Sequence, residues 1–115
     1  MALSVDRVIS GSTRAPAGPD AREVAERAAG CSTVARLSSG TFGEVATYLP
    51  GLRVPGVRVT PGALEVHVVS CWDVPMADVA AEVRAAVMPV ARGLEVAVFI
   101  DDIQLPTLHQ EGRQS

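Results

Sequence analysis

The feature that most constrains the fold is a pair of alternating segments between residues 56 and 70. Apolar and polar residues alternate on both sides of the sequence Thr60-Pro61-Gly62-Ala63. Proline followed by glycine at the centre of these four residues is typical of a type II turn. Because successive strand side chains point to opposite faces, the pattern predicts a hairpin with one apolar face. The apolar positions are Val57, Val59, Leu64, Val66 and Val68.

Two other segments, residues 19–29 and 73–90, carry apolar residues at the three- and four-residue spacing of a helix. Pro19 suits the first position of the earlier helix, and Gly30 provides its end. Asp73 is a natural N-cap for the later helix. We therefore expect two amphipathic helices, one before and one after the hairpin.

The remaining segments complete the predicted architecture. Residues 31–37 and 94–103 have the β-branched and apolar content of strands, whereas 38–55 is expected to be a long loop with room for one turn of helix. Helices with one apolar stripe need a sheet face to cover. The predicted fold class is α+β: two layers, a small mostly antiparallel sheet of three or four strands, and two helices packed on one face.

Length and composition set the domain organisation. A chain of 115 residues has room for one hydrophobic core, and a hydrophobic fraction of 48% is that of a folded domain. Most of this content is valine and alanine. We predict a single domain over residues 19–104, between a flexible lead-in at 1–18 and a flexible tail at 105–115.

Charge and hydropathy argue against several classes of partner. The formal net charge is −3, which disfavours binding to nucleic acid or to an anionic membrane surface. No apolar run approaches the roughly 20 residues of a membrane span. Residues 1–14 lack the apolar region of a secretory signal, so a cytosolic location is expected. All ten basic residues are arginine, as a high-GC bacterial genome would favour.

The few chemically reactive residues do not form a catalytic or metal-binding pattern. His67 and Cys71 fall on the same side of a strand, but four residues along it places them about 13 Å apart, too far for a nucleophile and its base. Cys31 lies forty residues from Cys71, and His109 lies in the tail. This is not the spacing of a zinc site. Both thiols are expected to be reduced, small buried groups.

Two further motifs are weak. Asp101 and Asp102 are adjacent, so on a regular strand their carboxylates would point to opposite faces and not share a cation. Residues 38–43 resemble a glycine-containing phosphate loop, but they lack its lysine. We therefore predict no catalytic residues, no cofactor and no metal.

The sequence also predicts a surface for a protein partner. Trp72, the sole tryptophan, stands at the corner between a strand and a helix, where it serves either as a partner anchor or as a packing hinge. Phe99 and Val69 lie on the second face of the sheet, which is only partly polar. That face is available for a protein partner.

Three stretches of sequence resemble the alkaline shock protein family of envelope-stress proteins. They have in common hydrophobic patterns flanked by glycine or proline, and together they cover about residues 20–104. Here the family's N-terminal strand is replaced by a lead-in rich in serine, proline and glycine, and the middle loop is long. The stretches are Glu23-Val24-Ala25 through Gly30-Cys31-Ser32-Thr33-Val34-Ala35-Arg36-Leu37-Ser38; Gly56-Val57-Arg58-Val59 with Leu64-Glu65-Val66-His67-Val68-Val69; and Val74-Pro75-Met76-Ala77-Asp78-Val79-Ala80-Ala81-Glu82-Val83-Arg84 with Gly93-Leu94-Glu95-Val96-Ala97-Val98-Phe99-Ile100-Asp101-Asp102-Ile103.

The resemblance implies a non-enzymatic cytosolic scaffold linked to cell-envelope stress or homeostasis. Such a protein would associate with itself or with a small membrane-anchor protein, and it would have no catalytic residues. Two alternatives remain open. A nucleic-acid-binding module would need the arginines gathered on one face, and a small thiol-dependent enzyme would need Cys31 and Cys71 to converge.

Overall fold

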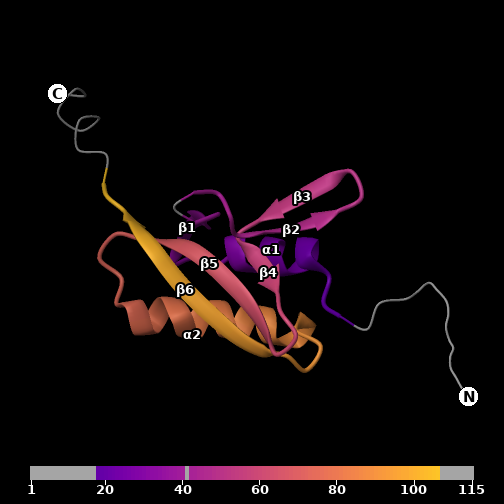
Figure 1. The fold of residues 1–115 in the computed structure, drawn as a ribbon. Coiled ribbons are helices and arrows are strands. Elements are labelled where there is room, and N and C mark those ends of the chain that lie inside the picture. Colours follow the sequence, from indigo (N-terminus) through magenta and orange to yellow (C-terminus); the bar gives the residue numbers. More distant parts are fainter. Residues whose placement is uncertain (1–17, 41, 107–115) are drawn as a thin grey trace, which may run out of the picture.

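A computed structural model describes residues 18–40 and 42–106, and it confirms the predicted α+β class. Two helices, a four-stranded mixed sheet and a separate two-stranded sheet make up the described part of the chain (Figure 1). The predicted lead-in and tail lie almost entirely outside the described residues. The elements in chain order are α1 (Ala21–Ala29), β1 (Val34–Leu37), β2 (Ala46–Leu49), β3 (Leu52–Pro55), β4 (Val57–Val59), β5 (Ala63–Cys71), α2 (Met76–Val87), a 3₁₀ turn η1 (Met88–Val90) and β6 (Glu95–Gln104).

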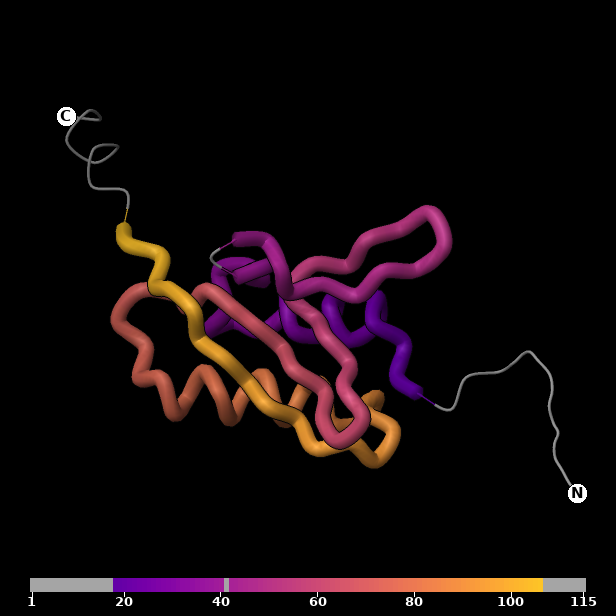
Figure 2. Tube along the Cα trace, in the orientation of Figure 1, coloured from indigo at the N-terminus to yellow at the C-terminus, as the bar shows by residue number. Residues whose placement is uncertain are grey.

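Strand β5 is the centre of the larger sheet. Its first half pairs antiparallel with β4 and its second half pairs antiparallel with β1, so both share one edge of β5. On the other edge β6 runs parallel to β5 along its whole length, after the chain has crossed over through α2. Figure 2 follows this crossover along the Cα trace. Most strand pairings are antiparallel, as predicted, but the longest one is parallel.

The core lies between the sheet and the two helices. Alternate residues of β5 face it, and α1 and α2 contact each other across it. Asp20 caps α1 by accepting a hydrogen bond from the backbone N–H of Arg22 at 3.0 Å, and Gly30 ends the helix. The core is rich in valine, as the composition indicated. Its fully buried members include Val24, Val57, Leu64, Val66, Val68, Val79, Val83 and Val87.

The predicted loop at 38–55 is the main error in the element assignment. Its second half forms the β2–β3 hairpin, with Tyr48 opposite Arg53 in register. Gly51 takes a φ of 71°, which permits the tight turn after Pro50. The strands are only four residues long, and their apolar spacing also fits one helical turn. Periodicity therefore could not distinguish the two structures.

Two local predictions also differ from the structure. The hairpin turn between β4 and β5 is present, but Gly62 does not adopt the positive φ of a type II turn. Thr60 instead accepts a hydrogen bond from the N–H of Ala63 through its hydroxyl. Asp73 does not cap α2: it has a φ of 66°, and the helix begins three residues later with Pro75 at the N-cap.

Candidate functional site

A connected set of polar side chains lies on the sheet face that the helices leave uncovered. The imidazole of His67 is its centre, with Nδ1 3.0 Å from Oδ2 of Asp101. Nε2 lies 3.6 Å from Oε1 of Glu65, which is too long for a hydrogen bond, and the ring stacks on Phe99 at a centroid distance of 4.4 Å. His67 was predicted to face the surface, and the structure confirms the face of the sheet but not the exposure. Its side chain points outward from the helices but is almost fully buried.

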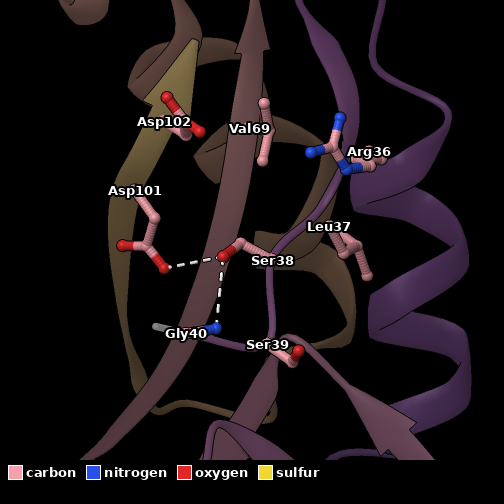
Figure 3. Close-up of a pocket in the computed structure, with 8 residues that line it drawn as sticks. All are labelled: Arg36, Leu37, Ser38, Ser39, Gly40, Val69, Asp101 and Asp102. Carbon is pink, nitrogen blue, oxygen red and sulfur yellow. Dashed lines mark hydrogen bonds between the residues drawn. The ribbon is translucent and has the colours of Figure 1, made fainter. Parts of the chain in front are cut away.

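The set continues into a shallow cleft at the β1 end of the sheet. Ser38 donates its hydroxyl to Oδ2 of Asp101 at 2.9 Å and accepts a hydrogen bond from the N–H of Gly40 at 3.2 Å (Figure 3). The cleft has a volume of about 330 Å³. Its lining residues are Arg36, Leu37, Ser38, Ser39, Gly40, Val69, Asp101 and Asp102.

The two aspartates share this cleft, contrary to the prediction that they diverge. On β6, Ile100 pairs with Val68 and Asp102 pairs with Val69, so Asp101 is an extra residue without a partner on β5. Such a β-bulge breaks the two-residue alternation, and both carboxylates then line one side of the sheet. Nothing in the sequence of β6 marks the position of the bulge.

The order of the polar groups does not suit nucleophilic catalysis. A catalytic serine needs a base that accepts its proton, with the acid behind that base. Here Asp101 lies between Ser38 and His67, so the hydroxyl bonds to the carboxylate and not to the imidazole. Within residues 18–40 and 42–106, no three metal-ligating side chains gather to hold a metal ion. These contacts hold the loop after β1 against the sheet.

The cysteines occupy neighbouring segments without forming a bond. The Cys71 thiol donates to the carbonyl of Ser32, the residue after Cys31, at 3.6 Å. Burial, and then the nearby Glu82 carboxylate, raise the pKa of the Cys31 thiol. A protonated thiol is a poor nucleophile, and His67 is engaged with Asp101 instead of Cys71. The geometry lends no support to a thiol-dependent activity.

In the described part of the loop at 38–43, which leaves out residue 41, a donor that an anion would need is already engaged. Oε1 of Glu44 accepts a hydrogen bond from the N–H of Phe42 at 3.0 Å, so a carboxylate already takes a donor that a phosphate would need. Five of the described arginines each donate to a different partner. Arg27, Arg53 and Arg84 donate to backbone carbonyls, Arg36 to Gln104, and Arg58 to Glu65.

The side chain of Glu82 on α2 forms hydrogen bonds with the segment that connects α1 to β1. Its carboxylate accepts hydrogen bonds from the N–H groups of Ser32 and Thr33 at 3.1 and 3.0 Å, and also from both hydroxyls. These bonds, above all the one from the Thr33 hydroxyl, lower the pKa of Glu82. From the sequence pattern, Glu82 was predicted only to lie on the polar side of the helix, and these hydrogen bonds were not predicted.

We expect the Glu82→Gln variant to change how stability depends on pH. A carboxyl whose pKa is lower in the folded state stabilises the fold above its unfolded pKa. That contribution is lost as the pH falls through the folded value. The free-energy difference between wild type and variant should therefore be largest at neutral pH and shrink on acidification. Urea denaturation between about pH 7 and pH 3 measures it. Glu26→Gln, at an exposed position of α1, is the matched control, and equal pH profiles for the two variants would contradict the assignment.

The structure places the three predicted partner residues differently from one another. Trp72 is 55% exposed and Phe99 is 42% exposed, so both present large apolar surface. Val69 is 3% exposed, because the loop after β1 and the bulge of β6 border it, and it is not itself open to a partner. Sequence reasoning missed Met76, Ile103 and Leu105, which are also exposed near Trp72.

Comparisons with known proteins find no matching family model, no similar curated protein and no similar solved structure. In the described part of the chain, α1 and α2 are both too short to cross a membrane.

Proposed function

We propose that this chain is a non-enzymatic cytosolic scaffold, linked to cell-envelope stress or homeostasis, that self-associates through β6 and docks on a membrane-anchored protein. The observation that carries the proposal is the free edge of β6. This strand is ten residues long, and among the described residues it pairs only with β5. Backbone N–H and C=O groups along such an edge are a template for another strand.

A second copy of the chain fits this edge well. An antiparallel pair of β6 strands centred on Phe99 places the two phenylalanines opposite each other. In the same register Asp101 lies opposite Ala97. The bulge at Asp101 ends the regular part of β6, so this pairing covers residues 97–101, and within it no carboxylate faces another. The resulting sheet would run continuously through both copies.

Size-exclusion chromatography with light scattering tests self-association. We expect a dimer or larger species, and we expect Phe99→Lys to weaken the association about tenfold or more, because two charges would then meet at the centre of the pair. Phe42→Lys is the matched control, since Phe42 is 90% exposed and does not belong to β6. Phe99→Lys also removes the stacking partner of His67 and so can destabilise the fold. Ala97→Glu therefore serves as a second variant, because Ala97 lies outside the core and faces Asp101 of the other copy in the proposed pair.

Fractionation of cells with and without the membrane-anchored partner tests the docking role. We expect the chain to pellet with membranes only when that partner is present. A strictly monomeric chain that never pellets with membranes would contradict the proposed function.

A further inference from the structure

An exposed apolar surface lies at the corner where β5 turns into α2 and β6 ends. We call Trp72, Met76, Ile103 and Leu105 the Trp72 corner. Two adjoining depressions of about 520 and 360 Å³ meet there and share Met76 and Ile103 in their linings. All four side chains are exposed, Leu105 the most at 62%. Large apolar side chains gathered in this way are a feature of interaction sites.

The rim of the Trp72 corner carries charge of one sign. Asp73 borders the first depression, and Asp101 and Asp102 border the second. No arginine lines either depression. The Asp101 carboxylate is engaged with Ser38 and His67, so the charges left at the rim are Asp73 and Asp102. An occupant would therefore bury apolar side chains in the depressions while positive groups face these two carboxylates.

The backbone at the corner is held in an unusual conformation. Asp73 has a φ of 66°, the left-handed region that residues other than glycine seldom adopt. This residue reverses the chain between β5 and the start of α2, next to the exposed Trp72.

We propose that the Trp72 corner binds a protein segment whose apolar side chains are flanked by arginine or lysine. This inference rests on the proposed docking role and names the chemistry of the docked segment, but it does not depend on self-association through β6. Apolar contact gives the affinity, and Asp73 and Asp102 select against an acidic segment. The same aspartates disfavour an anionic lipid surface as the occupant.

Titration of the full chain with synthetic peptides tests this proposal. The first probe is an 18-residue amphipathic peptide of leucine and arginine, and the second has glutamate in place of each arginine. Because Trp72 is the only tryptophan, its emission reports directly on the corner. We expect a saturable blue shift with the arginine peptide that weakens as salt is added, and none with the glutamate peptide. Absence of binding at low salt would overturn the proposal, as would preferential binding to phosphatidylglycerol vesicles.

Matched variants separate the corner from general attraction to an acidic protein. We expect Met76→Ser to weaken binding about tenfold, as at an interface anchor, and Met88→Ser to have no effect. The two methionines are equally exposed, at 56% and 57%, and lie at opposite ends of the helical segment. Asp102→Asn should weaken binding about threefold to fivefold, and Glu95→Gln should not. Equal effects within either pair would overturn the proposal. Light scattering on the same variants reports self-association separately.

Discussion

Replacing Gly56 with alanine is expected to destabilise the fold by about 2–5 kcal/mol, the sum of a backbone cost and a packing cost. Gly56 has a φ of 87°, where a side chain is strained. A β-carbon there would lie 2.8 Å from Cβ of Leu37 and 3.3 Å from the carbonyl oxygens of His67 and Ser38. These atoms belong to β1, to the residue after it and to β5, so the clash is relieved only by moving the sheet.

Gly51→Ala separates the two costs. Gly51 also has a positive φ, 71°, but nothing lies within 4 Å of the added β-carbon. We therefore expect a loss of only about 1–2 kcal/mol, from the backbone conformation alone. Urea denaturation of both variants measures the difference. Equal losses would show that the close approach at Gly56 is not the constraint that the structure indicates.

Truncating Leu64 to alanine is expected to cost about 2–5 kcal/mol of unfolding free energy. Leu64 is fully buried on β5 and is among the largest side chains in a core built mainly of valine. Its removal leaves a cavity between the sheet and the helices that small, β-branched neighbours cannot readily fill. A loss of this size is a large share of the stability of an ordinary domain, about 5–15 kcal/mol.

Leu52→Ala is the control for the loss of a leucine side chain as such. Leu52 lies on β3, 41% exposed, and we expect its truncation to change the unfolding free energy by less than about 1 kcal/mol. Thermal and urea denaturation of the two variants provide the comparison. If both lost the same amount, Leu64 would not be the core position that its burial implies.

The helices and the central hairpin could be predicted because their signals are local. Two apolar stripes identified α1 and α2, and two-residue alternation identified β4 and β5. The Trp72 corner could be predicted only in part. Trp72 and Phe99 stood out as single large residues, whereas Met76 and Leu105 are separated by 29 positions in the chain and meet only in the folded molecule. No local pattern connects them.

The α+β class and the two amphipathic helices could be predicted from the periodicity of neighbouring residues, and the valine-rich core from composition. Three other features depend on the tertiary structure. These are the parallel pairing of β6 with β5, the bulge that turns Asp101 and Asp102 into one cleft, and the burial of His67 between Phe99 and Asp101. Each depends on which strand lies beside which, and in what register, and a shift of one residue reverses the face that every side chain presents.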